Sequence, residues 1–179
     1  MMGWKNGVTG CVLKLKKSVK KVLNNQVIKI DSLPVLTPLQ HQEEDSLVLE
    51  WYEVNRTLIK RETLSGRMIH LDKPLSAVLQ QGTVIYLDEV CVIRIFIKPC
   101  TCIVLHSNDL ELVGLFCFDV GNRHLPIYLI DENKIAFAYD GQLFPALQQK
   151  YGSPVTLANY RLDPSQMINC YGNIVGQKR

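Results

Sequence analysis

The chain has 179 residues and is 47% hydrophobic, which is enough to bury a core in one large domain or two small ones. Its formal net charge of +3 is too small to indicate nucleic-acid binding. No run approaches the ~18 apolar residues of a membrane span, and lysines interrupt the apolar residues near the N-terminus, so we expect no membrane anchor, no signal peptide and a cytoplasmic location.

Residues 1–25 are predicted to form a basic N-terminal extension. This segment holds five closely spaced lysines, Lys14, Lys16, Lys17, Lys20 and Lys21. The apolar residues between them could line one face of a helix on a membrane surface, but that helix would be short and poor in aromatic residues. We therefore favour a solvated extension.

Residues 26–99 have the pattern of a small all-β domain, in which short runs of β-branched and aromatic residues alternate with turn signals. The acidic, proline-containing stretch over 33–44 is interpreted as a loop, and Lys98-Pro99 ends the domain. The predicted strands cover residues 27–30, 47–54, 57–63, 68–71, 84–87 and 90–97. An exposed strand edge could accept a partner peptide, and a plain structural domain is the alternative.

Residues 100–164 alternate between strands and helices. The predicted strands cover 101–105, 127–130, 134–139 and 155–162, and the predicted helices cover 108–121 and 142–151. The resulting order βαββαβ indicates a ferredoxin-like domain. The fold class is therefore predicted to be α+β, with a small N-terminal all-β domain, a ferredoxin-like domain and a C-terminal tail over 165–179.

The two helices are predicted from their caps and from apolar residues at helical spacing. Asn108 is the expected N-cap of the first helix, and Glu111 would complete a capping box. The predicted buried stripe of this helix is Leu110, Val113, Gly114, Cys117, Val120 and Gly121. The predicted buried stripe of the second helix, which Gly152 is expected to end, is Leu143, Leu147 and Tyr151.

The sequence Gly121-Asn122-Arg123-His124 ends the first predicted helix. Because Pro126 prevents the helix from continuing, Arg123 and His124 leave it at the C-terminal end, where the helix dipole favours cations. One interpretation is a basic helix terminus with no further role. The other is that the imidazole is a metal ligand.

Gly-Asn-Arg-His after an apolar helix, followed by a proline, a short strand, Phe-Ala-Tyr-Asp-Gly over 137–141 and a second helix, resembles the signature of the urease accessory protein UreE family. The similarity covers most of residues 47–172 and is strongest over 108–164. It implies a non-enzymatic nickel metallochaperone that delivers Ni(II) to the urease apoprotein, with His124 as the metal ligand across a homodimer interface. The implied partners are the urease apoprotein complex and GTP-dependent accessory proteins, and Zn(II) could bind at the same site.

One imidazole cannot hold Ni(II) or Zn(II), which take about four to six ligands. A two-fold axis near His124 would supply a second imidazole, and a dimer of dimers would supply four. Gly121, Asn122 and Arg123 are assigned to the motif with positioning roles. Asn122 is expected to close the helix end, and Arg123 to pair with a carboxylate or a carbonyl.

The chain departs from the family pattern in its histidines. The strand before the second helix and the C-terminal tail lack the additional histidines of many family members, so few bound ions per dimer are expected. Cys170 is a candidate auxiliary ligand from the tail, although a free thiol is the favoured interpretation. His41, His70 and His106 have no partner at ligand spacing and are expected to be structural.

The six cysteines are expected to be free thiols in a reducing compartment. The pair in Cys100-Thr101-Cys102 could bind a metal, but it lacks the spacing of a strong zinc site. Its position at the start of an apolar strand favours core packing.

Three alternatives to the nickel metallochaperone were weighed. The first is a metal-binding protein that serves another nickel or zinc enzyme. The second, a single-zinc enzyme, needs three ligands in one chain, and no HxH or HExxH cluster occurs. The third, an RNA-binding module, needs an RNP-like motif, and Phe137 and Tyr139 share a strand face without the glycines and basic residues of that motif. No nucleic-acid or membrane partner is expected.

Overall fold

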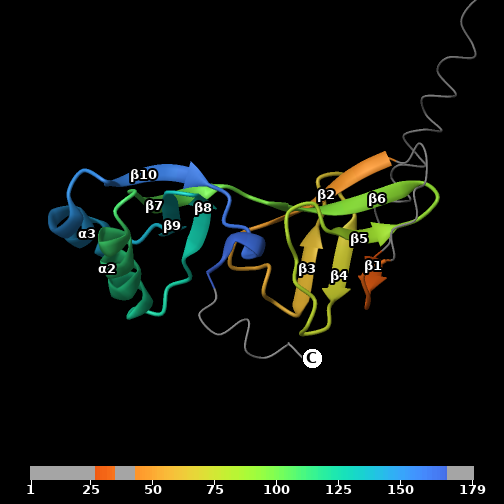
Figure 1. Cartoon of the computed structure of the whole chain (residues 1–179). Coiled ribbons are helices and arrows are strands. Elements are labelled where there is room, and N and C mark those ends of the chain that lie inside the picture. Colours follow the sequence, from red (N-terminus) through yellow and green to blue (C-terminus); the bar gives the residue numbers. More distant parts are fainter. Residues whose placement is uncertain (1–26, 35–42, 169–179) are drawn as a thin grey trace, which may run out of the picture. The chain divides into compact units, whose positions relative to one another are not determined.

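The computed structural model describes residues 27–34 and 43–168 (Figure 1). Within these ranges the chain is α+β, with mostly strands and two α-helices. None of the helices in this part of the chain is long and apolar enough to cross a membrane. The predicted extension over 1–25, His41 and Cys170 lie outside the described residues.

The described residues divide into two compact units, each assembled from segments that are separate in the sequence. The first unit contains the described residues up to Val48, Arg56–Ala77 and Gly82–Phe96. The second unit contains Leu49–Asn55, Val78–Gln81 and the described residues from Ile97 onward.

Two three-stranded sheets make up the first unit, in the orders β1-β4-β3 and β2-β6-β5 (Figure 1). β1 pairs in parallel with β4, whereas β3 pairs with β4 and β5 pairs with β6 in antiparallel orientation. The strands are β1 (Val27–Ile30), β2 (Glu43–Leu49), β3 (Leu58–Glu62), β4 (Met68–Asp72), β5 (Val84–Leu87) and β6 (Cys91–Ile97).

Period-two alternation explains how these strands form a core. In β4, Ile69 and Leu71 are buried while the residues on either side of them face outward. Successive side chains of a strand point to opposite faces, so an apolar residue at every second position gives each sheet one buried face. With the exception of β2, the predicted strands of this unit are confirmed within two residues.

The prediction for β2 was wrong. The strand spans Glu43–Leu49 instead of 47–54, so the acidic stretch that was interpreted as a loop ends in the strand. Asp45 in this strand is buried, which the sequence pattern did not anticipate for a carboxylate.

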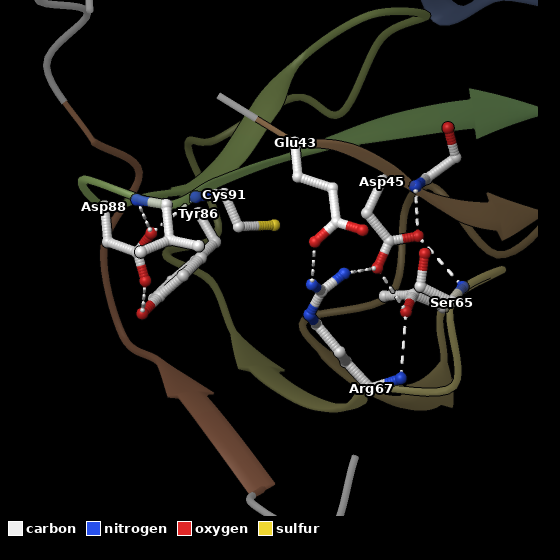
Figure 2. A network of polar contacts seen from close by, with 10 residues as sticks. Glu43, Asp45, Ser65, Arg67, Tyr86, Asp88 and Cys91 are labelled. Atoms are coloured by element: carbon white, nitrogen blue, oxygen red, sulfur yellow. Dashed lines mark hydrogen bonds and ion pairs between the residues drawn. The ribbon is translucent and has the colours of Figure 1, made fainter. Parts of the chain in front are cut away.

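A polar network explains why the acidic residues of β2 are tolerated (Figure 2). Oδ2 of Asp45 accepts hydrogen bonds from Thr63 Oγ1 at 2.6 Å and from Arg67 Nη1 at 2.7 Å. Oδ1 accepts from two backbone N–H groups at 2.8 and 3.1 Å. Arg67 also donates through Nη2 to Glu43 Oε2 at 2.9 Å. Both sheets take part, because Asp45 lies in β2 and its partners flank the turn between β3 and β4.

The second unit has a four-stranded antiparallel sheet in the order β10-β7-β9-β8 (Figure 1). Along the chain its elements alternate as strand, helix, two strands, helix, strand. They are β7 (Cys100–His106), α2 (Leu110–Gly121), β8 (Tyr128–Asp131), β9 (Lys134–Ala138), α3 (Leu143–Tyr151) and β10 (Val155–Tyr160), followed by the 3₁₀ turn η1 (Pro164–Gln166).

This sheet is covered on both faces. α2 and α3 pack on one face, where Phe116 of α2 meets Tyr151 of α3 edge-on with ring centroids 5.4 Å apart. The other face buries Tyr128 and Leu162, and Trp51 packs against it from the Leu49–Asn55 segment. Alternate residues of β7 therefore contribute to two separate apolar clusters.

The start of α2 differs from the prediction by one residue. The N-cap is Asp109, whose Oδ1 accepts hydrogen bonds from the backbone N–H groups of Glu111 at 2.9 Å and Leu112 at 3.3 Å. The predicted cap, Asn108, instead accepts a hydrogen bond from the Asn133 side chain at 3.2 Å. Both residue types cap helices well, so the sequence could not distinguish them.

The predicted buried stripe of α2 was also wrong in part. The fully buried residues are Phe116 and Val120, and Phe116 was absent from the prediction. Leu110 is 84% exposed, and Gly114 and Gly121 are exposed as well. Apolar residues occur on both sides of this helix, so spacing alone could not identify the side that faces the sheet.

The prediction for α3 is confirmed. Leu143, Leu147 and Tyr151 are its buried residues, and Gly152 follows as the C-cap with a φ of 73°. Only glycine adopts such a positive φ without steric cost, which is why it commonly ends a helix.

Candidate functional site

The Gly-Asn-Arg-His motif forms a tight turn at the end of α2. Gly121 is the last helical residue and Asn122 is the C-cap, with φ −62° and ψ −16°. The backbone N–H groups of Asn122, Arg123 and His124 donate to carbonyls of the last helical turn at 3.0, 3.1 and 2.9 Å. The motif is therefore fixed by main-chain hydrogen bonds, although it lies at the surface.

His124 has a φ of 57°, and it is the only described non-glycine residue with a positive φ. This left-handed conformation reverses the chain after the helix and leads it through Leu125 and Pro126 toward β8. The His124 side chain is exposed and makes no hydrogen bond or ion pair with another described residue. Its imidazole nitrogens are thus available to a ligand from outside the chain.

Arg123 lies beside His124 and is also exposed. Its positive charge acts on two nearby carboxylates. Hydrogen bonds from Lys150 and Tyr151, assisted by the charge of Arg123, lower the pKa of Asp119. The pKa of Asp140 is lowered by backbone hydrogen bonds at the start of α3 and, more weakly, by Arg123. Both carboxylates are therefore ionised well below neutral pH.

Asp119 connects the two helices beside the motif. Its Oδ2 accepts a hydrogen bond from Lys150 Nζ at 2.7 Å and another from the Tyr151 hydroxyl at 2.6 Å. A surface pocket of about 450 Å³ adjoins these groups. It is lined by Asp119, Asn122, Arg123, Leu143, Ala146, Leu147 and Lys150.

The outer side of α2 is mostly apolar and continuous with the motif, and the exposed Glu111 is the charged residue on this side, in the first turn of the helix. Because the helix has 3.6 residues per turn, Phe118 lies about 160° around the axis from Phe116 and also from Val120. Phe118 is 66% exposed although it is aromatic. We call this surface the apolar face of α2, and it consists of Leu110, Gly114, Leu115, Phe118 and Gly121.

At two glycines of the apolar face, no described residue leaves too little room for a side chain. A Cβ atom added at Gly114 or at Gly121 would meet no atom within 4 Å. An exposed glycine in a helix costs roughly 1 kcal/mol relative to alanine. The two positions leave the backbone of α2 open to close approach from outside.

Sequence reasoning missed this surface because it placed Leu110, Gly114 and Gly121 in the core. One signal could have revealed it. Only Glu111 and Asp119 are charged among the 12 residues of α2, so the helix is apolar nearly all round. A helix of this composition needs burial on more than one side.

Among the described residues, the structure does not place His124 in a group of metal ligands. Across residues 27–34 and 43–168, no group of three or more His, Cys, Asp or Glu residues could hold a metal ion. His70 lies in β4 of the first unit, and His106 ends β7 with its backbone N–H donating to Pro154 at 3.0 Å. A metal bound by His124 would need further ligands from outside any such group of the described residues.

The Cys100–Cys102 pair lies on the face of the sheet that the helices do not cover. Cys102 is fully buried and Cys100 is partly buried, with their Sγ atoms 3.8 Å apart. Burial raises the pKa of both thiols, that of Cys102 to about 12. Core packing was predicted for this pair, and Cys102 does contribute to the core.

Comparison with known proteins identifies relatives over most of the chain. No protein-family model matches it. The urease accessory protein UreE of Acetivibrio thermocellus is 30% identical over 109 residues, which cover 61% of this chain and 71% of that protein. The UreE of Lysinibacillus sphaericus is 31% identical over 121 residues, which cover 64% of this chain and 81% of that protein. The UreE of Actinobacillus pleuropneumoniae is 28% identical over 138 residues, covering 76% and 73%. With identities of 30 and 31% over more than two thirds of two relatives, this chain belongs to the family of the urease accessory protein UreE.

Proposed function

We propose that this protein is a metallochaperone that binds Ni(II) and delivers it to the urease apoprotein during maturation of the urease active site. The relatives are named urease accessory proteins, so the chain is an accessory protein and not an enzyme. The observation that carries the proposal is the exposed, unpartnered imidazole of His124 in a turn that main-chain hydrogen bonds hold in place. Nickel is the cargo in this function.

The chemistry of the motif supports His124 as the ligand. Neutral imidazole suits Ni(II) and also Zn(II), which would compete for the same site. Arg123 stays protonated and cannot bind a metal, so a positioning role is assigned to it and to Asn122 and Gly121. One imidazole per chain is too few for either ion, and a second copy of the chain has to contribute another.

The apolar face of α2 supports a homodimer as the means of bringing two imidazoles together. Its exposed leucines and Phe118 would be buried against the same surface of a second copy, because a two-fold interface uses one patch twice. Gly114 and Gly121 would allow the two helices to approach closely. For the two His124 residues to meet, the axis must pass near the C-terminal end of α2, where Gly121 belongs both to this face and to the motif.

The arrangement of the second unit supports its assignment as a ferredoxin-like metal-binding domain, which we place at 100–164. The order of elements along the chain and the strand order β10-β7-β9-β8 are consistent with that fold. The β-rich residues 26–99 are proposed as a separate domain that could bind a partner peptide. Residues 165–179 are proposed as a tail that follows the metal-binding domain. We expect nickel delivery to take place in the cytoplasm, with the urease apoprotein complex and the GTP-dependent accessory proteins as partners.

Nickel titration calorimetry tests the proposal on the wild type, His124→Ala and His106→Ala, with the mass of each in solution measured by light scattering. His106 is the matched control because it is also an exposed histidine of the second unit. We expect the wild type and His106→Ala to bind about one ion per dimer. His124→Ala should lose this site while remaining a dimer. Equal binding by a dimeric His124→Ala would refute the role of His124.

A further inference from the structure

The second unit holds a pair of thiols that the proposed nickel site does not use. Cys100 and Cys102 are two residues apart in β7, so their side chains point to the same face of the sheet. That face carries the apolar cluster around Tyr128 and lies opposite the helices. The Sγ atoms are 3.8 Å apart, which makes them the closest thiol neighbours described in the chain.

The separation of the two sulfurs distinguishes between the uses of such a pair. A disulfide would require the sulfurs to come to about 2.05 Å, and it would join positions whose Cα atoms lie about 6.6 Å apart along a strand, near the upper limit for a disulfide. A tetrahedral cation with metal–sulfur bonds of about 2.3 Å requires sulfurs about 3.8 Å apart. The observed spacing, at which one thiol can also donate a hydrogen bond to the other, equals the second requirement.

We propose that Cys100 and Cys102 form a two-thiolate site for a thiophilic cation with tetrahedral preference, of the Zn(II) type. Thiolates are soft donors that select ions such as Zn(II), whereas imidazole binds nickel, copper and zinc alike. The site is separate from the His124 motif in sequence and on the sheet, and it does not depend on the proposed nickel function.

The surroundings of the pair are suited to an ion. Cys102 is flanked across the sheet by Ala138 on one side and Ala158 on the other, so no bulky neighbour stands beside its thiol on these strands. Cys100 is partly exposed and gives access from solvent. The negative charge of Glu50, which also pairs with Lys98 at 3.1 Å, acts on the Cys100 thiol and would favour a cation at this position.

The site would be reached from solvent only on the side of Cys100, because Cys102 is fully buried. Because the described residues hold no group of three His, Cys, Asp or Glu ligands, donors from outside that set, such as water, would complete the coordination. Burial also raises the pKa of the thiols, so the pair is protonated without metal and is a poor nucleophile at neutral pH. These properties distinguish the site from a closed structural zinc centre and from a reactive cysteine.

Cadmium titration of the reduced full-length chain tests the site. The background variant carries Cys11→Ser, Cys117→Ser and Cys170→Ser, which leaves Cys91 as the third thiol. Thiolate-to-metal charge-transfer absorption in the near ultraviolet reports binding. We expect a band that saturates at about one Cd(II) per chain.

Variants in this background assign the band to its residues. Cys100→Ser and Cys102→Ser should each abolish most of it, whereas Cys91→Ala and His124→Ala should keep it. Cys91 is the matched control because its thiol is buried like that of Cys102. Circular dichroism verifies folding, and Cys100→Ser alone decides the result if Cys102→Ser does not fold. Absence of the band in the folded background, or a band that Cys100→Ser leaves unchanged, overturns the proposal. The His124→Ala result separates it from the nickel function.

Discussion

The backbone of His124 holds a conformation that its residue type adopts only at a cost. A left-handed φ such as 57° costs about 1–2 kcal/mol for a residue with a Cβ atom, whereas glycine adopts it freely. The N–H of His124 keeps its hydrogen bond to the helix at 2.9 Å in this conformation. Backbone strain at a surface residue with an unpartnered side chain is consistent with a functional use of that side chain.

Replacing His124 by glycine and by alanine separates the backbone from the ligand. Both variants lose the imidazole and should lose the nickel site. His124→Gly relieves the steric cost, so its free energy of unfolding should exceed that of His124→Ala by about 1 kcal/mol. Urea unfolding monitored by circular dichroism measures the difference at low protein concentration. Equal stabilities would show that the left-handed turn carries no strain.

Among the elements, β2 depends on a side chain from beyond the next strand in the sequence. Arg67 is 22 positions from Asp45, and it holds this carboxylate and that of Glu43 at the same time. Burial alone would raise the pKa of Asp45, but hydrogen bonds from Thr63 and Arg67 lower it below the ordinary value. The same ion pairs raise the pKa of Arg67 against the effect of burial.

The lowered pKa of Asp45 predicts a loss of stability in acid. Because the folded-state pKa is below the unfolded value of about 3.9, ionised Asp45 stabilises the fold above that pH. The contribution is lost as the pH falls through the folded pKa. Asp45→Asn should therefore be less stable than the wild type at neutral pH, and the difference should shrink in acid.

Urea unfolding of Asp45→Asn and the wild type between neutral and acid pH measures this effect. Asp72→Asn is a suitable control, since Asp72 is exposed at the end of β4. A stability difference for Asp45→Asn that does not change with pH would contradict the assignment. Arg67→Met should be the more damaging change, by about 3–5 kcal/mol, because it leaves a buried carboxylate without its partner.

The strands and α3 were predictable because their signals are local. Leu143, Leu147 and Tyr151 recur at helical spacing with Gly152 after them, and the structure buries these three. β2 was misjudged because the partner of Asp45 lies 22 residues away, where no local pattern reveals it. α2 was misjudged because Phe118 and Phe116 give it two apolar sides, and only the sheet determines which is inward.

At the scale of the whole molecule, the family and its motif were identified from the sequence, whereas the composition of the second unit was not. The segments 49–55 and 78–81 belong to this unit although they are separated in the sequence from its main part, which begins at Ile97. Trp51 covers one sheet face, and the Gln81 backbone N–H donates to Asp163 at 2.7 Å. These are tertiary contacts between segments that are far apart in the sequence, and the local periodicity of a sequence does not predict such contacts.

The proposed dimer predicts the effect of a charge on the apolar face of α2. Phe118→Asp should convert the dimer to a monomer at micromolar concentration, because an aromatic residue buried at an interface is worth about 2 kcal/mol or more. The helix itself should stay folded, since Phe118 makes no contribution to the core. Analytical ultracentrifugation over a dilution series measures the dissociation constant.

Leu75→Asp provides the control for this variant. Leu75 is 88% exposed but belongs to the first unit and not to the proposed interface on α2, so its replacement should leave the dimer intact. Nickel binding should fall in Phe118→Asp although His124 is unchanged, because two imidazoles no longer meet. A Phe118→Asp variant that stays dimeric would exclude this face as the interface.

The placement of His124 next to Arg123 has a kinetic consequence. A divalent ion held at this exposed turn would experience repulsion from a permanent positive charge on the adjacent residue. Water can reach the open coordination positions from the solvent side. The residence time of the ion should therefore be short, and a client that offers more ligands could take it by stepwise ligand exchange. Release would then require neither unfolding nor an external energy source at this protein.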